Sequence, residues 1–342
     1  MHTCIQGVLE VLSGESLRVA VVGLGKMGLL HASILNVLPN VQLAALCDKG
    51  VIVRRFLKKI FKGIRIVDDL EKLSDLGLDA VYVTTPIASH FLVARTIYLT
   101  KIARNLFVEK TLASSYDKAK ELCALAHRYG DTNMVGYVRR FAVTFKKAED
   151  LLAQDAIGEL ISFKAYAYSS DFLGNRTRTP ASRGGVLGDL GCHVVDLAIW
   201  FFGEFQLRSA KLASLTGDGS EDSAYFRVEK SNGLEGEFDI SWCMENYRMP
   251  VAGLSISGSK GIIEVNDDKL ELELNNGKSS IWYRHDLSDN VFFWLGGPEY
   301  FREDECFVRS VIEGDNAEPS FYTASKVDQI IEQIKNRADE SE

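Results

Sequence analysis

The chain has 342 residues, of which 46% are hydrophobic, 25% are charged and only 6 are prolines. This composition excludes a disordered, collagen-like or low-complexity protein, and the length fits two globular domains better than one. The net charge of −8, without a dense basic patch, argues against binding to nucleic acid or to anionic membranes.

The cysteines argue against a metal site and against a disulfide framework. The 6 cysteines are far apart in the sequence, and no two form a C-x-x-C pair. No apolar run approaches the roughly 18 residues that a membrane-spanning helix needs. The N-terminus also lacks the basic region and cleavage site of a signal peptide. We therefore expect a reduced, cytoplasmic protein without a metal.

The first half of the chain alternates predicted strands with predicted helices. Short apolar runs rich in β-branched residues predict buried strands at 17–22, 41–47, 80–83, 105–108 and 133–136. Apolar residues at helical spacing predict helices at 27–37, 54–61, 89–100 and 115–128. Repeated strand–helix units predict a doubly wound parallel sheet of the Rossmann type.

The second half shows a different pattern. After a predicted helix at 145–152, alternating residues predict strands at 160–168, 224–229, 235–242, 269–274 and 280–284. Two Asn-Gly pairs, Asn232-Gly233 and Asn276-Gly277, predict hairpins between neighbouring strands. Further helices are expected at 186–202 and 323–336. This half is therefore predicted to be an α+β domain with a mainly antiparallel sheet.

These patterns predict four segments. Residues 1–16 form an N-terminal extension, 17–137 a dinucleotide-binding Rossmann domain, and 138–322 a domain for substrate binding and oligomerisation. Residues 323–342 form a C-terminal helix that we expect to pack back on the Rossmann domain.

A glycine-rich turn lies between the first predicted strand and the helix after it. The sequence Gly23-Leu24-Gly25-Lys26-Met27-Gly28 fits the pattern G-x-G-x-x-G, in which the glycines allow a tight turn, close approach of a pyrophosphate and helix packing. Asp48 ends the second strand, where a carboxylate binds ribose hydroxyls. NAD is the expected cofactor, and NADP stays open because Lys49, Arg54 and Arg55 are near. The alternative is a glycine turn that binds nothing.

Two further segments carry candidates for catalysis. Glu109-Lys110-Thr111 directly follows a predicted strand, and ligands of doubly wound sheets bind beyond the carboxyl ends of the strands. A lysine there can reach the nicotinamide end of a dinucleotide. In the predicted helix at 186–202, Asp189, His193 and Asp196 are spaced i, i+4 and i+7. We expect them to form an acid–base cluster on one helix face.

With these motifs, the sequence from residue 17 onward resembles the Gfo/Idh/MocA family of oxidoreductases. Several motifs carry the resemblance, and together they are specific although no single one is. They are the glycine turn with Asp48, Thr85-Pro86 with His90, Glu109-Lys110-Thr111 for the family's E-K-P, the stretch from Gly136 to Phe141, the stretch from Gly185 to Asp196, and the stretch from Glu305 to Pro319.

The resemblance implies roles for individual residues. Lys110 and His193 would act on the substrate hydroxyl, with Asp189 orienting the pair. We expect His193 to be the base or relay and Lys110 to polarise the hydroxyl, although which of them takes the proton stays open. The resemblance further implies cofactor contacts from Lys26, Met27, Thr85, Pro86, His90, Glu109 and Lys110, and substrate contacts from Lys110, Tyr137, Arg139, Arg183, Asp189 and His193. It also implies a homodimer or homotetramer formed through the second sheet.

The chain departs from the family pattern at two positions. Thr111 replaces a proline that follows an often cis peptide bond in the family, so Lys110 is expected to be aimed differently. Val186 replaces the third glycine before the helix, and its β-branched side chain restricts the backbone.

Several candidates also have a purely structural reading. His90 can be a packed histidine, and Tyr137, Arg139 and Arg140 can simply hold the domain junction. Arg176, Arg178 and Arg183 either bind an anionic substrate or lie on a solvated loop. We expect the region of Trp294, Tyr300 and Phe301 to pack in a sheet or an interface.

The sequence therefore predicts an NAD(P)-dependent oxidoreductase. It would transfer a hydride between nicotinamide and a secondary alcohol or ketone of a sugar, an inositol, a sugar phosphate or a nucleotide sugar. The alternatives are a dihydrodiol or imine reductase of the same family and a non-catalytic dinucleotide-binding sensor. Lys110, Asp189 and His193 favour an enzyme, because a sensor does not need groups that transfer a proton.

Overall fold

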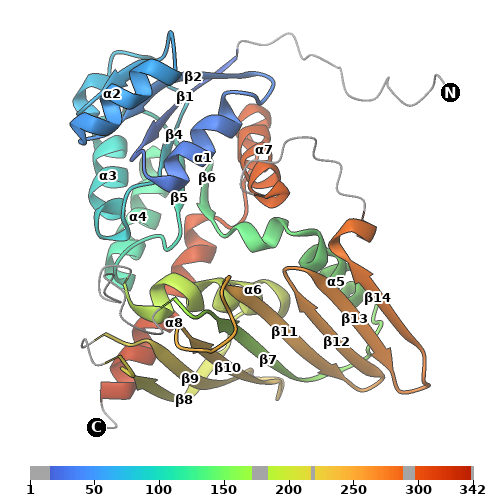
Figure 1. Cartoon of the computed structure of the whole chain (residues 1–342). Coiled ribbons are helices and arrows are strands. Elements are labelled where there is room, and N and C mark those ends of the chain that lie inside the picture. The colour runs from blue at the N-terminus through green and yellow to red at the C-terminus, as the bar shows by residue number, and fades with distance from the viewer. Residues whose placement is uncertain (1–15, 172–183, 217–219, 288–296, 340–342) are drawn as a thin grey trace, which may run out of the picture.

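The computed structural model describes residues 16–171, 184–216, 220–287 and 297–339, which form two sheets with helices packed on them (Figure 1). The N-terminal sheet has six parallel strands in the order β3-β2-β1-β4-β5-β6. Its strands are β1 (Leu17–Val22), β2 (Val41–Cys47), β3 (Arg65–Val67), β4 (Ala80–Val83), β5 (Asn105–Glu109) and β6 (Asn133–Gly136). The predicted Rossmann sheet is confirmed. β3 was not predicted, because three residues are too few to show a pattern.

The helices of this part follow the strands in turn. They are α1 (Lys26–Leu35), α2 (Val51–Ile60), α3 (Ile87–Leu99) and α4 (Tyr116–Tyr129), with a short 3-10 turn at Leu70–Leu73. Every residue of β4 is buried, as expected of a central parallel strand covered on both faces. The strand order reverses between β1 and β4, and this reversal is the point where ligands of such sheets bind.

The second sheet has eight strands in the order β14-β13-β12-β11-β7-β10-β9-β8. They are β7 (Leu160–Tyr168), β8 (Gln206–Ala213), β9 (Ser223–Glu229), β10 (Glu235–Ser241), β11 (Val251–Gly258), β12 (Gly261–Asn266), β13 (Lys269–Leu274) and β14 (Ser279–Tyr283). β7 and β10 pair in parallel and the other neighbours are antiparallel, which confirms the predicted mainly antiparallel sheet. β8, β11 and β12 were not predicted. β11 mixes serines and glycines with its apolar residues, so its alternation is weak.

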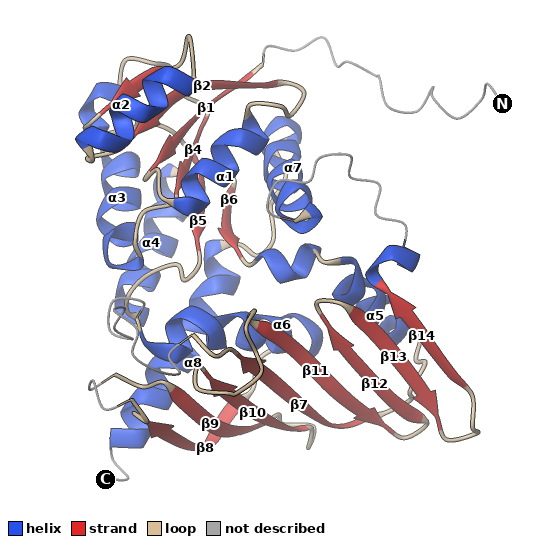
Figure 2. Cartoon of the chain, in the orientation of Figure 1, coloured by secondary structure: helices blue, strands red, loops and turns tan. Residues whose placement is uncertain are grey.

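Helices cover one face of the second sheet, and no helix of the described residues covers the opposite face (Figure 2). The covering helices are α5 (Val143–Ala153), α6 (Cys192–Phe202) and α8 (Phe321–Asp339). Beneath them, Phe163, Ala165 and Ala167 of β7 are buried. No helix in the described part of the chain is long and apolar enough to cross a membrane.

α7 (Pro298–Glu313) packs against α1, although the sequence analysis placed its residues in the second domain. The expectation that Tyr300 and Phe301 pack in a sheet is wrong, because both lie on α7 beside the core of the Rossmann part, and the alternative of interface packing stays a prediction. The reason is that Glu303 and Asp304 of this helix are fully buried, so its apolar pattern is interrupted by acids. Trp294 lies outside the described residues. The domain boundaries stay a prediction.

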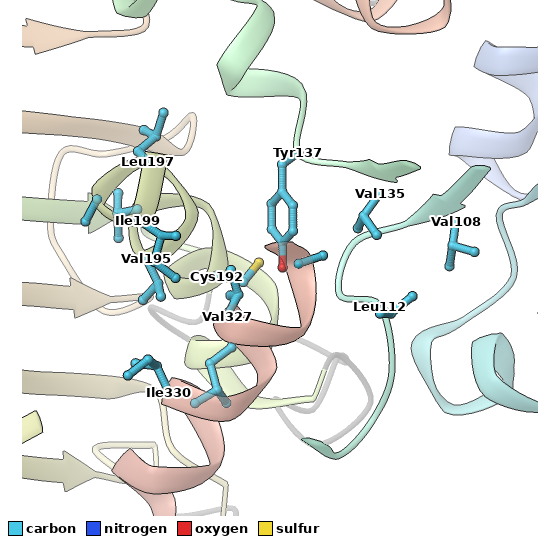
Figure 3. Packing of buried hydrophobic residues seen from close by; sticks show 14 of the residues in the cluster. Val108, Leu112, Val135, Tyr137, Cys192, Val195, Leu197, Ile199, Val327 and Ile330 are labelled. Carbon is cyan, nitrogen blue, oxygen red and sulfur yellow. The ribbon is translucent and has the colours of Figure 1, made fainter. Parts of the chain in front are cut away.

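A single hydrophobic cluster connects the two sheets. Figure 3 shows its central part, where Tyr137 reaches from the end of β6 toward Cys192 of α6 and Val327 of α8. Val108 and Val135 of the first sheet belong to the same cluster as Phe238 and Ile256 of the second. The site described next lies at this junction.

Candidate active site

The glycine turn has the geometry of a phosphate cradle. Gly23 has a φ of +95°, and a Cβ there would lie 2.7 Å from the backbone nitrogen of Thr85. A Cβ at Gly28 would overlap the Gly23 carbonyl oxygen, whereas a Cβ at Gly25 would meet nothing within 4 Å. The first and third glycines are therefore required by packing, and the second leaves the backbone open. α1 begins beside Gly25 without a side-chain cap, so its first amides are available to phosphate oxygens.

Asp48 is fixed beside this turn. Its carboxylate accepts hydrogen bonds from the backbone N–H of Leu24 at 2.7 Å and of Gly50 at 2.6 Å. It lines a cavity of about 400 Å³ together with Gly23, Thr85, Pro86 and acidic residues from the loop after β3. Each carboxylate oxygen has lone-pair capacity left for a further donor. The predicted ribose-binding carboxylate thus faces a cavity of suitable size.

A second cavity of about 390 Å³ lies on the other side of Thr85 and Pro86. Met27, Glu109, Lys110 and Asp189 line it. The two cavities share the Thr85-Pro86 segment, which follows β4 at the strand-order reversal. A larger cavity, of about 560 Å³, lies between α6, β8 and α8 and contains none of the predicted site residues. Together, the two cavities that share Thr85-Pro86 form the groove in which a dinucleotide would lie.

Lys110 and Asp189 form an ion pair at the second cavity. The Lys110 Nζ donates to the Asp189 carboxylate at 2.9 Å and to the Asp189 backbone carbonyl at 2.7 Å. The carbonyl belongs to a π-helical turn at Leu187–Gly191, where the helix does not keep its regular hydrogen-bonding register. The Lys110–Thr111 peptide bond is cis. These two hydrogen bonds bring together Lys110 and Asp189, which are 79 positions apart in sequence.

The surroundings of Lys110 keep it protonated. Burial alone would lower the pKa of Lys110, but neighbouring Cys192 and Asp189 outweigh burial and raise that pKa above its usual value. Burial raises the pKa of the Cys192 thiol to about 12, so the thiol is neutral and Asp189 supplies the stabilising charge. Lys110 is therefore a hydrogen-bond donor and a cation at neutral pH.

His193 is held in its neutral form. Burial lowers the pKa of His193 well below its usual value, and the positive charges of Arg139 and Lys110 lower that pKa further. The His193 ring lies edge-on to Tyr137, with 6.3 Å between ring centroids. Its Nδ1 is buried and has no hydrogen-bond partner among the described residues. A neutral imidazole beside a cationic lysine can accept a proton.

Asp196 does not join the acid–base cluster that the spacing predicted. Its carboxylate accepts two hydrogen bonds from the Arg140 guanidinium, at 2.6 and 2.8 Å, in a buried pair. Arg139 is likewise bound to Asp267, with both distances 3.1 Å. Tyr137 is also buried. The structural reading of Arg140 at the domain junction is thus the one that the geometry supports.

His90 ties two loops of the site together. Its Nδ1 lies 2.8 Å from the Thr111 carbonyl oxygen and its Nε2 lies 2.7 Å from the Thr85 carbonyl oxygen. The ring is buried, so both nitrogens are occupied by backbone oxygens. Its position supports the packed reading, in which His90 fixes Thr85 and Thr111 instead of meeting a ligand.

The remaining predicted residues are placed as follows. Lys26 is exposed at the first position of α1. Gly184 and Gly185 have positive φ values of +83° and +81°, whereas Val186 has a helical φ of −62°. The third glycine of the family pattern is therefore not needed for the backbone here. Arg176, Arg178 and Arg183 lie outside the described residues.

Sequence reasoning missed a buried cluster behind Glu109. His31, on the inner face of α1, has its Nε2 3.0 Å from Glu109 and its Nδ1 2.8 Å from Asp304 of α7. His31 and Asp304 are fully buried. A histidine on an apolar helix face needs polar partners, and this need was the one signal available in the sequence. The partners themselves come from distant parts of the chain.

Comparisons with known proteins agree with this geometry. Residues 17–137 match the model of the oxidoreductase family with an NAD-binding Rossmann fold, and residues 145–264 match the GFO/IDH/MocA C-terminal domain. The chain belongs to the Gfo/Idh/MocA family of oxidoreductases. It is thus an NAD-binding oxidoreductase, as the sequence predicted.

Individual relatives are distant in sequence. The scyllo-inositol 2-dehydrogenase (NAD(+)) of Bacillus subtilis is 26% identical over 66% of this chain and 68% of its own length. The D-glucoside 3-dehydrogenase of Escherichia coli is 22% identical over 88% of this chain and 90% of its own. Among solved structures, levoglucosan dehydrogenase in complex with NADH superposes with a TM-score of 0.87 at 18% identity, covering 95% of this chain and 97% of the other. That likeness shows the shared fold.

Proposed function

We propose that this protein is an NAD-dependent dehydrogenase that interconverts a secondary alcohol and a ketone on a sugar or an inositol, free, phosphorylated or nucleotide-linked. The observation that carries the proposal is the Lys110–Asp189 pair at the cavity that adjoins the dinucleotide turn. A bound nicotinamide dinucleotide supplies the hydride acceptor or donor for such a reaction. Relatives named for inositol and glucoside dehydrogenation support the substrate class.

Two groups with different charges act on the substrate hydroxyl in this proposal. Cationic Lys110 donates a hydrogen bond to the substrate oxygen and stabilises the negative charge that develops there. Neutral His193 accepts the hydroxyl proton during oxidation and returns it during reduction. Asp189 fixes the Lys110 ammonium by binding it through two oxygens. The raised pKa of Lys110 and the lowered pKa of His193 favour His193 as the base.

NAD is preferred over NADP in this proposal. Three carboxylates, of Asp48, Asp68 and Asp69, line the cavity beside the glycine turn and outnumber the one cation in its described lining, Lys49, so they would repel a 2′-phosphate. Arg54 does not offset them, because its guanidinium donates to the carbonyls of Asp48 and Lys49 and lies 3.7 Å from Asp68. The test compares kcat/KM for the two cofactors in the wild type and in Asp48→Asn. We expect the wild type to prefer NAD and the variant to lose most of that preference.

We also propose that the second sheet pairs two or more copies of the chain. Its helix-free face carries two exposed isoleucines, Ile262 and Ile281, together with charged residues such as Lys164 and Arg227. An uncovered eight-stranded face of this kind is typical of a subunit interface. Sedimentation of the purified protein tests this proposal: a monomer at micromolar concentration would contradict it.

The activity is tested by following nicotinamide absorbance while NAD and NADP are offered against inositols, sugars, sugar phosphates and nucleotide sugars. Turnover of one class that is abolished in Lys110→Ala and His193→Ala would support the proposal. Lys120→Ala is the matched control, because Lys120 is an exposed lysine on α4. Cofactor binding without turnover of any class would favour a sensor, and no binding of either cofactor would refute the proposal.

A further inference from the structure

The buried cluster around His31 lies directly behind the wall of the second cavity, the one lined by Lys110 and Asp189. We call it the nicotinamide-side cavity. Glu109 is the only member of the trio His31, Glu109 and Asp304 that lines this cavity. One Glu109 oxygen faces His31 Nε2 at 3.0 Å, and the other accepts the backbone N–H of Lys110 at 3.1 Å. The cluster therefore joins α1, β5 and α7 to the backbone of the lysine in the site.

The cluster fixes the charge of Glu109 as well as its position. Burial alone would lower the pKa of His31, but Asp304 and Glu109 raise it well above its usual value, so the ring is an imidazolium. Burial alone would raise the pKa of Glu109, and the hydrogen bond and charge of His31 overcome burial and lower it. Glu109 is thus a buried carboxylate that stays ionised.

Among the residues that the structure describes, the charges around the cavity leave one carboxylate uncompensated. Burial raises the pKa of Asp304, but its carboxylate lies 2.8 Å from His31 Nδ1 and is the counter-ion of that ring. Asp189 neutralises Lys110. Arg139 is paired with Asp267. Glu303, which is also buried on α7, has its pKa raised well above the usual value by burial and is therefore a neutral acid. The Glu109 charge is what remains at the wall of the cavity.

We propose that His31 and Asp304 are positioning residues that hold Glu109 as a fixed negative charge beside the nicotinamide, so that the site favours the oxidised cofactor. This inference rests on the proposed function, because it requires a nicotinamide dinucleotide in the groove. The oxidised nicotinamide ring is a cation and the reduced ring is neutral. A fixed carboxylate at the cavity wall stabilises the cation and does nothing comparable for the neutral ring.

The test measures the dissociation constants of NAD and NADH without substrate, by titration calorimetry and NADH fluorescence, in wild type and variants. Glu109→Gln keeps the shape and hydrogen-bonding capacity but removes the charge, and we expect the NADH-to-NAD ratio of dissociation constants to fall roughly tenfold. Glu305→Gln removes a carboxylate from an exposed position of α7 and is the matched control, with an unchanged ratio.

His31 is tested by a double-mutant cycle. In His31→Gln the ratio should fall as in Glu109→Gln, because Glu109 without its cation takes up a proton. The double variant should then equal Glu109→Gln within about twofold. If His31→Gln does not fold, Asp304→Asn is measured in its place. Without the Asp304 charge, the His31 imidazolium neutralises Glu109, so the ratio should again fall. A merely structural cluster would weaken the binding of both cofactor forms equally.

The outcomes separate this inference from the proposed function. If both forms bind and the ratio is the same in Glu109→Gln as in Glu305→Gln, the inference is wrong and the proposed function stands. If the effects of His31→Gln and Glu109→Gln add independently, the positioning role is wrong. If neither cofactor form binds the wild type, the proposed function itself fails.

Discussion

Two ion pairs on one helical segment differ in their exposure to solvent and in their expected role. The open pair, Lys110–Asp189, lies at a cavity, with side chains 18% and 20% exposed. The closed pair, Arg140–Asp196, lies two turns further along, with side chains 8% and 1% exposed. Both join the segment of residues 187–202 to the end of a strand in the Rossmann part. The same helix therefore serves the site at its beginning and holds the domain junction in its middle.

The difference between the pairs follows from their cations and their access to solvent. Arg140 offers a planar fork that matches both oxygens of Asp196, and burial of the pair keeps the remaining guanidinium N–H groups away from a ligand. Lys110 is a compact ammonium with three donors, of which two are used by Asp189. The third donor remains for a substrate oxygen. Sequence spacing alone treats Asp189 and Asp196 alike, and only their partners distinguish them.

The largest effect is expected from removing the cation of the open pair. Lys110→Ala should lower kcat by roughly 10²–10⁴-fold, because the donor to the substrate oxygen is lost. Stability should change little, since Asp189 is partly exposed and can be solvated. Steady-state kinetics and thermal melts check both statements. Near-normal turnover in this variant would end the distinction between the two pairs.

Breaking the closed pair should lower the stability of the fold rather than the activity of the folded protein. Arg140→Ala leaves Asp196 as a buried charge without a partner, and the free energy of unfolding should fall by about 3–5 kcal/mol. Replacing both residues by leucine should cost less than the single change, because no charge is then stranded. Urea unfolding of the single and double variants measures this. A double variant that is less stable than Arg140→Ala would contradict the prediction.

A subtler change sharpens the comparison at the open pair. Asp189→Asn keeps a hydrogen bond to Lys110 but removes the negative charge, so kcat should fall roughly tenfold. The equivalent Asp196→Asn should instead lower the melting temperature and leave kcat of the folded protein nearly unchanged. Measuring both quantities in both variants gives a two-by-two test. Equal effects on kcat would show that the pairs are not functionally distinct.

The smallest effect concerns pH, and it involves His193, which lies between the two pairs in sequence. Burial, helped by Arg139 and Lys110, lowers the pKa of His193 well below 6.5, so the ring stays neutral as pH falls through 6.5. The rate of alcohol oxidation should therefore show no loss attributable to His193 until the pH is well below that value. Arg139→Gln removes one cause of the lowered pKa and should move the acid limb to higher pH. An acid limb already centred near 6.5 in the wild type would argue against His193 as the base.

The sequence predicted the Rossmann part well, because buried parallel strands such as β4 are short and uniformly apolar. It failed where burial and polarity do not coincide. α7 was missed because Glu303 and Asp304 are buried acids, and β11 because its serines and glycines hide the alternation. In each case tertiary contacts decide the structure, and local pattern does not show them.

The candidate site was predicted in its members but not in its connections. Lys110 and Asp189 do meet, and the charge of Lys110 acts on His193, yet the π-helical turn that presents the Asp189 carbonyl leaves no trace in residue spacing. The pairing of His31 with Asp304 joins residues 273 positions apart. Asp196 was assigned to the site because its arginine partner could not be seen from the helix alone.

The hydrophobic cluster that runs through both sheets has a consequence for unfolding. The Rossmann part also has a second cluster of its own, but melting either domain would expose apolar side chains of the cluster that both share. The two sheets should therefore unfold in one cooperative transition. By mass action, a ligand that binds only the folded glycine turn would then raise the melting temperature of the distant eight-stranded sheet as much as that of its own domain.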